Sequence, residues 1–185
     1  MSISTSDKLN VEIMDHTALI TIDNPGANTW DTESLPALAA LIDALNADKN
    51  IYALVITGQG EKFFSAGADL NLFADGDPNN ARRMAEFFGK GFECLANFRG
   101  VSIAAINGFA MGGGMETALC CDIIIASENA KFALPEVKVG FFAAAGGVQR
   151  LSRQIGKKAA VEIMLTGRSV LAAEALELGI VNEVV

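Results

Sequence analysis

The hydrophobic and polar positions of this chain follow two periods, which predict two kinds of element. Short runs that are almost wholly apolar predict buried strands, and apolar residues spaced three and four apart predict helices. The predicted strands cover residues 11–14, 18–22, 51–57, 101–106, 122–126 and 180–185, with a short extended piece at 131–137. The predicted helices cover residues 81–98, 147–155, 157–165 and 171–178, and two more run to residue 47 and from Met115 onward.

Capping residues and glycines set the expected ends of these elements. Asp31 or Thr32 can cap the first helix, and Gly156, Gly167 and Gly179 stand where helix stops are expected. No linker or low-complexity stretch divides the chain, apart from a polar loop that we predict to be mobile at 75–80. We therefore expect one α/β domain over residues 1–185.

Composition narrows the class of partner. The 185 residues are 51% hydrophobic and carry a net charge of −8. A strongly acidic chain lacks the basic face that non-specific nucleic-acid binding requires, so no nucleic-acid partner is expected. The first residues lack a signal-peptide pattern and no apolar run reaches about 18 residues, so we expect no membrane association and a cytoplasmic protein.

The scarcity of histidine excludes several chemistries. His16 is the single histidine and lies between two predicted strands, where a hairpin turn is expected. One histidine in a turn makes a Ser–His–Asp triad improbable and is too few for a multi-histidine metal site, so no metal site is predicted. Cys94, Cys120 and Cys121 lack metal-ligand spacing and read as core thiols of a reducing compartment.

A glycine-rich junction is the main candidate for chemistry. The predicted strand 101–106 leads into three consecutive glycines at 112–114, and Glu116 follows within the first turn of a predicted helix. Unpaired N–H groups at a helix start can donate to a developing negative charge, and glycine allows a ligand to approach closely. A tight packing turn with a helix-start glutamate explains the same spacing, so both interpretations stay open.

A second junction has the same form. The segment 62–68 breaks at small residues, and Asp69 begins a possible helix. Taken alone, it favours an ordinary strand-to-helix turn capped by Asp69. Trp30 lies in a turn-rich stretch, where it either lines a binding groove or packs on the first helix.

Four segments together resemble the crotonase, or enoyl-CoA hydratase/isomerase, superfamily. They are Ser65-Ala-Gly-Ala-Asp69, Asn107-Gly-Phe-Ala-Met-Gly-Gly-Gly-Met-Glu116, Leu134-Pro-Glu-Val-Lys-Val-Gly140 and Ala145-Gly-Gly-Val-Gln-Arg-Leu151. Their order and separations match that superfamily over nearly the whole chain. The resemblance implies a spiral of repeated ββα units that binds an acyl-CoA thioester.

The resemblance also implies a mechanism. The thioester carbonyl is expected to lie between the backbone N–H groups of Ala68 and Gly113. Glu116 is expected to orient and deprotonate water, while Glu136 supplies the proton to Cα, which is hydration of a trans-2-enoyl-CoA without metal or cofactor. Both glutamates being present favours a hydratase of fatty acid metabolism over an isomerase, which commonly relies on an acid at the position of Glu136.

Further residues are carried over in the same way. Substrate and CoA contacts are expected at Ala27, Asn28, Ala66, Asp69 and Leu70. Where the superfamily often has Pro-Gly-Ala-Gly-Gly, this chain has Ala-Ala-Ala-Gly-Gly at 143–147. The backbone amide that helps to hold the water in relatives would therefore come from Ala144.

Chain length is the largest departure from the superfamily. Its members usually continue into a helical C-terminal segment that assists trimer formation, and this sequence supplies none, as a truncated or incomplete chain would. A homotrimer or a dimer of trimers is expected where the full-length chain is present. Besides the isomerase, the alternatives are a non-catalytic acyl-CoA-binding or assembly protein and, made improbable by His16, a protease of the related spiral fold.

Overall fold

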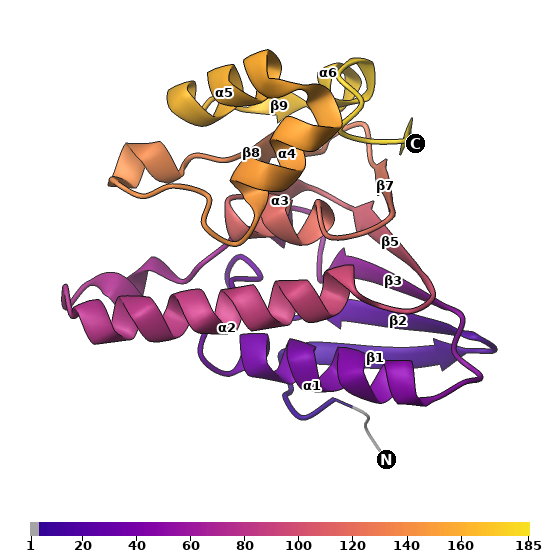
Figure 1. Ribbon diagram of the computed structural model, residues 1–185. Coiled ribbons are helices and arrows are strands. Elements are labelled where there is room, and N and C mark those ends of the chain that lie inside the picture. The colour runs from indigo at the N-terminus through magenta and orange to yellow at the C-terminus, as the bar shows by residue number, and fades with distance from the viewer. Residues whose placement is uncertain (1–3) are drawn as a thin grey trace.

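Two sheets form the frame of the protein. The computed structural model describes residues 4–185 (Figure 1). The larger sheet has the order β1 (Leu9–Met14), β2 (Thr17–Ile22), β3 (Ala53–Gly58), β5 (Val101–Ile106), β7 (Ile123–Ala126) and β10 (Glu183–Val184). The smaller sheet has the order β4 (Phe63–Ser65), β6 (Phe109–Met111), β8 (Lys131–Ala133) and β9 (Val170–Leu171). Among the described residues, only the pairs β1/β2 and β8/β9 are antiparallel.

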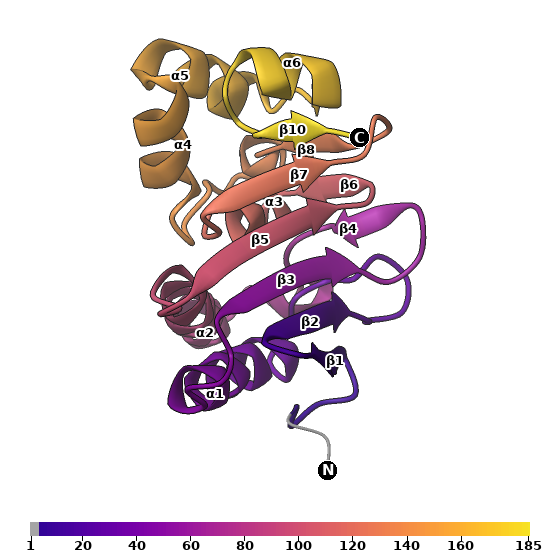
Figure 2. The same cartoon turned by 90° about the vertical axis from the view of Figure 1, so that its right-hand side faces the viewer.

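A repeated unit generates both sheets. Each turn of the chain adds one strand to the large sheet, one to the small sheet, and then a helix, as in β3–β4–α2 (Pro78–Ala96) and β5–β6–α3 (Gly113–Ala118). Figure 2 shows the strands of the large sheet rising in order from β1 to β10. This arrangement confirms the predicted α/β spiral of ββα units.

Alternating burial explains how the large sheet holds its helices. Along β2 and β3 every second residue is fully buried, as period-2 strands with one face toward a core require. Helices α1 (Ser34–Ala47) and α2 pack against each other and cover β1 to β3 (Figure 1). The predicted hairpin is confirmed, because β1 and β2 pair in register around a turn that contains His16.

Side-chain caps shift several predicted boundaries. The Asp31 carboxylate accepts the N–H groups of Glu33 and Ser34 at 3.0 and 2.8 Å. It therefore binds the backbone at the start of α1, although the residue that flanks the helix is Glu33 and not Asp31 or Thr32. Asp77 accepts the N–H of Asn79 at 2.8 Å, so α2 begins at Pro78 and the polar loop is shorter than predicted.

Two predictions about the middle of the chain are wrong in detail. The segment 131–137 is not one extended piece, because β8 ends at Ala133 and a 3₁₀ turn, η2 (Glu136–Val139), follows. Helix α3 begins at Gly113, two residues before the expected start. The strands β4, β6 and β9 have three residues or fewer, which is too short for a periodic signal.

The last third of the chain is helical as predicted. It contains α4 (Gly147–Ile155), α5 (Lys157–Thr166) and α6 (Ala172–Glu177). The glycines expected as helix stops, Gly156, Gly167 and Gly179, all have positive φ, between 58° and 83°. Within residues 4–185, no helix has the length and apolar character needed to cross a membrane.

Candidate active site

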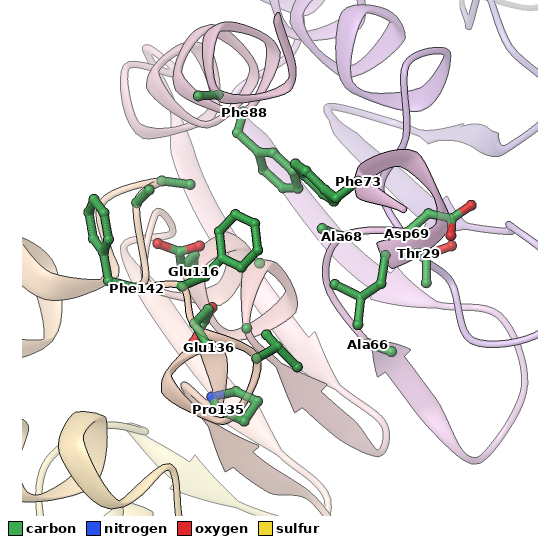
Figure 3. A pocket seen from close by; sticks show the side chains of 18 of the residues that line it. Thr29, Ala66, Ala68, Asp69, Phe73, Phe88, Glu116, Pro135, Glu136 and Phe142 are labelled. Carbon is green, nitrogen blue, oxygen red and sulfur yellow. The ribbon is translucent and has the colours of Figure 1, made fainter. Parts of the chain in front are cut away.

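A cavity of about 610 Å³ opens where three parallel strands of the small sheet end. The segments that follow β4, β6 and β8 all contribute to its wall, because the carboxyl ends of parallel strands meet at one edge. Figure 3 shows Glu116 and Glu136 on one side, with Ala66, Ala68 and Asp69 across from them. The two junctions noted in the sequence therefore form one site.

Glycines are required at the β6–α3 junction by close contacts. Gly112 has a φ of +52°, and a Cβ placed on it would lie 2.9 Å from Glu136 Oε1. A Cβ on Gly114 would collide with the backbone carbonyl of Ser65 in β4. The Gly112 N–H donates to the Ala133 carbonyl at 2.8 Å, which ties this junction to β8. The glycine triplet thus serves tight packing and at the same time forms the floor of the cavity.

Glu116 is held rigidly by the protein. It lies in the first turn of α3 and is only 4% exposed. Its Oε1 accepts the N–H of Gly147, the first residue of α4, at 2.8 Å. Burial raises the pKa of Glu116 to about 7, against the hydrogen bond from Gly147, and the neighbouring Glu136 adds to the increase. Near neutral pH this carboxyl group can both accept and release a proton.

Glu136 has fewer partners. It begins η2 directly after Pro135, and burial raises its pKa above the ordinary value. Its Oε2 is buried and has no hydrogen-bond partner within residues 4–185. An orphaned buried oxygen at the wall of a cavity indicates that the missing partner is a ligand or water.

Two backbone amides line the same cavity as these carboxyl groups. Ala68 and Gly113 line the cavity, and in the described part of the chain neither N–H has a hydrogen-bond acceptor. The two loops are in close contact, since a Cβ on Gly67 would lie 2.8 Å from the Gly113 nitrogen. Unpaired donors this close together can both bind one oxygen atom.

Comparison with protein families identifies the family of this chain. The model of the enoyl-CoA hydratase/isomerase family matches residues 12–185. The chain belongs to the enoyl-CoA hydratase/isomerase family. This confirms the resemblance drawn from the four sequence motifs.

Curated relatives of this family agree. The chain is 43% identical over 185 residues to a probable enoyl-CoA hydratase of Rhizobium meliloti, covering 97% of this chain and 69% of that protein. It is 40% identical to the short-chain-enoyl-CoA hydratase of Clostridium acetobutylicum and 42% identical to the carnitinyl-CoA dehydratase of Salmonella enteritidis. Those alignments cover 91% and 90% of this chain, and 65% and 63% of the relatives. The chain thus spans about two thirds of these relatives.

Solved structures superpose closely on this chain. Pseudomonas aeruginosa DspI is 58% identical, with a TM-score of 0.96 over 97% of this chain and 74% of that one. The enoyl-CoA hydratase of Bacillus anthracis is 36% identical, with a TM-score of 0.94 over 97% of this chain and 70% of that one. The family fold is therefore present throughout the described residues.

The residues predicted to contact substrate divide into two groups. Ala66, Asp69 and Leu70 line the cavity. Ala27 and Asn28 do not, because the Asn28 side chain is buried and donates to two backbone carbonyls at 2.9 and 3.0 Å. The Ala27 carbonyl accepts the Ala66 N–H at 2.9 Å, so this stretch supports the cavity wall from behind. Contact of Ala27 and Asn28 with CoA stays a prediction of the family resemblance.

The sequence analysis missed one important donor. The N–H that donates to Glu116 Oε1 belongs to Gly147. Ala144 lines the cavity, and the expectation that its N–H holds a water stays a prediction. A Cβ on Gly147 would lie 2.9 Å from Glu116 Oε1 and 2.9 Å from the Ala143 Cβ. The signal available in the sequence was the second of two glycines at the start of a helix.

Trp30 is resolved as a core residue. It is fully buried and does not line the cavity. Its ring packs edge-on with Phe92 in α2, with centroids 5.9 Å apart, so it packs on the second helix. Packing on the first helix stays a prediction. Among the described residues, no group of three or more His, Cys, Asp or Glu side chains is placed to hold a metal ion.

Proposed function

We propose that this chain is the core of an enoyl-CoA hydratase that adds water across the double bond of a trans-2-enoyl-CoA thioester. The observation that carries the proposal is one cavity with a buried glutamate, a half-buried glutamate and two unpaired backbone amides. The family name includes both hydratase and isomerase, and the glutamate pair favours the hydratase. An isomerase needs a single group to move one proton, whereas hydration needs a base for water and an acid for Cα.

The proposed reaction begins with the carboxylate of Glu116. It takes a proton from water as the water oxygen bonds to Cβ, and the double-bond electrons move toward the thioester carbonyl. The resulting enolate oxygen accepts the N–H groups of Ala68 and Gly113. Fixed donors of this kind typically contribute about 3–4 kcal/mol each to transition-state stabilisation.

The second half of the reaction uses the neutral carboxyl group of Glu136. It delivers its proton to Cα, and the carbonyl re-forms as the 3-hydroxyacyl-CoA product leaves. Transfer of a proton from Glu116 to Glu136 through an incoming water restores both groups. Because two close carboxyl groups share their protons, the pair is expected to titrate as a unit. As proposed, the reaction requires no metal or redox cofactor.

The test follows the loss of conjugated-thioester absorbance with crotonyl-CoA. We expect turnover by the wild type and a loss of about 10²–10⁴-fold in both Glu116→Gln and Glu136→Gln, the range for removing an acid or base. Glu128→Gln is the matched control, because that glutamate is exposed and lies outside the cavity. Wild-type rates in Glu136→Gln would contradict the proposal.

Two other outcomes would select the alternatives. Conversion of a 3-enoyl-CoA at a rate well above crotonyl-CoA hydration would indicate the isomerase. CoA-thioester binding without any turnover would indicate the non-catalytic acyl-CoA-binding protein. Because microscopic reversibility lets one pair of carboxyl groups run the reaction both ways, dehydration of 3-hydroxyacyl-CoA is expected to depend on the same two glutamates.

Association into a homotrimer stays part of the proposal. Exposed apolar side chains on the C-terminal third support association there, with Leu165, Leu171 and Leu176 between 44% and 69% exposed. Light scattering on the purified protein would measure the number of copies.

A further inference from the structure

Trp30, the single tryptophan of the chain, is hydrogen-bonded to both segments that carry the amides of the candidate site, and it does not line the cavity. It comes just before the first helix, far in sequence from either amide. Its ring packs edge-on against Phe92, which packs in the same way against Phe88, with centroids 5.3 Å apart. Phe88 lines the cavity, so the indole supports the wall from behind.

The backbone of Trp30 fixes the first amide. Its N–H donates to the Gly67 carbonyl at 2.8 Å, and its carbonyl accepts the N–H of Asp69 at 3.0 Å. The Gly67 carbonyl and the Ala68 N–H belong to one planar peptide group and point in opposite directions. A hydrogen bond to that carbonyl therefore sets the direction of the Ala68 N–H and polarises it.

The side chain of Trp30 reaches the helix that carries the second amide. Its Nε1–H donates to Thr117 Oγ1 at 3.0 Å, and the Thr117 hydroxyl donates to the Gly113 carbonyl at 2.7 Å. Trp30 and Thr117 are both fully buried, so water cannot replace either bond. The hydroxyl oxygen accepts from the indole, and its hydrogen is free to donate to the Gly113 carbonyl.

We infer that Trp30 is a positioning residue that joins the two segments that carry the carbonyl-binding amides. Its backbone orients the peptide group of Ala68, and its indole, through Thr117, anchors the first turn of α3, where Gly113 lies. The inference rests on the proposed function, since it assumes that a thioester oxygen binds these amides. Two donors act on one oxygen only when both point at it, and a shared support keeps their mutual geometry constant. Thr117 directly follows Glu116, so the same contact also fixes the first turn that carries the base.

The test measures carbonyl polarisation as well as rate. Trp30→Phe removes the indole N–H and keeps an aromatic ring, while Thr117→Val removes the hydroxyl and keeps the side-chain shape. The probe is a cinnamoyl-CoA thioester, whose bound absorbance moves to longer wavelength when its carbonyl is polarised. We expect both variants to reduce that shift and to lower kcat about tenfold, less than the 10²–10³-fold loss of a whole donor, with KM within about twofold.

Thr117→Ser is the matched control for Thr117→Val. It restores the hydroxyl, and we expect it to recover most of the wavelength shift and of kcat. The double variant Trp30→Phe/Thr117→Val should lose no more than either single variant, because both interrupt one chain of hydrogen bonds. Thermal unfolding of each variant is measured first, and the assays are run at a temperature at which all variants are folded.

The outcomes separate this inference from the proposed function. A wild-type protein that binds the probe without any wavelength shift would overturn both. A wild-type shift that Trp30→Phe and Thr117→Val retain in full would overturn the positioning role alone. Equal losses in Thr117→Val and Thr117→Ser would also overturn it, because the effect would then follow from packing and not from the hydroxyl.

Discussion

Glu116 and Glu136 are the same residue type and line one cavity, yet their burial and their hydrogen bonds differ. Glu116 lies in a helix, is 4% exposed, and has a carboxylate oxygen bound to the Gly147 N–H. Glu136 lies on a 3₁₀ turn, and its buried Oε2 has no partner in the described chain. The protein thus fixes one carboxyl group and leaves the other for a ligand.

The difference has a local cause. Glu116 is placed by a glycine junction that is packed against β4 and by a second helix that begins opposite it. Glu136 follows Pro135 shortly after β8, and its buried Oε2 has no hydrogen-bond partner in the described chain. Two carboxyl groups in different surroundings are suited to separate acid and base roles.

The largest expected effect separates these two roles. Exchange of the Cα hydrogens of butyryl-CoA in D₂O needs only the group that handles the Cα proton. Glu136→Gln should slow this exchange by about 10²–10⁴-fold, whereas Glu116→Gln should slow it by about tenfold or less. Proton NMR of the recovered thioester measures the rate. Equal losses in both variants would mean that the roles are shared.

The next effect concerns stability. The folded-state pKa of Glu116 is raised from 4.5 to about 7, so the folded protein binds its proton more tightly than the unfolded chain. The contribution of Glu116 to the free energy of unfolding is therefore fully present below the unfolded-state pKa. It is lost as the pH rises toward 7, by about 3 kcal/mol in all. Glu116→Gln cannot ionise and should be more stable than the wild type at pH 8, by up to that amount.

Urea unfolding at pH 8 and pH 5 tests this expectation. The advantage of Glu116→Gln should shrink at the lower pH, because the wild-type carboxyl group is then mostly protonated in the folded state. The exposed control Glu128→Gln should change stability by no more than about 0.5 kcal/mol at either pH. A destabilised Glu116→Gln at pH 8 would contradict the burial argument.

A smaller effect tests how firmly Glu116 is held. Gly147→Ala places a Cβ 2.9 Å from Glu116 Oε1 and 3.0 Å from its Cγ, which must displace the carboxylate. We expect turnover to fall about tenfold, because small displacements of a catalytic group cost up to 10²-fold. Gly89→Ala in α2 is the control, since a Cβ there meets nothing within 4 Å. Crotonyl-CoA hydration by the two variants provides the comparison.

The smallest effect concerns the coupling between the two glutamates. The proximity of Glu136 contributes to the raised pKa of Glu116 after burial and against the Gly147 hydrogen bond. Glu136→Gln removes that like charge, so the pKa of Glu116 should fall below about 7 by less than about one unit. NMR titration of ¹³C-labelled glutamate measures both values. An unchanged midpoint would show that Glu136 is already neutral when Glu116 titrates.

The sequence by itself determined the elements with strong local signals. The strand segments predicted from the sequence overlap every strand of the large sheet, and Asp69 marked the start of a 3₁₀ turn. The motif order identified the family and nominated Glu116, Glu136, Ala68 and Gly113, all of which line one cavity. These features depend on residues close together in the chain, where spacing carries the information.

Tertiary structure alone decided what depends on contacts between distant segments. The Gly147 N–H meets Glu116 across 31 residues, and the Trp30 indole meets Thr117 across 87. The strands β4, β6 and β9 of the small sheet are too short to specify themselves and form only because neighbouring strands supply their hydrogen bonds. Sequence spacing cannot predict such contacts, because the two partners lie far apart in the chain and meet only in the folded structure.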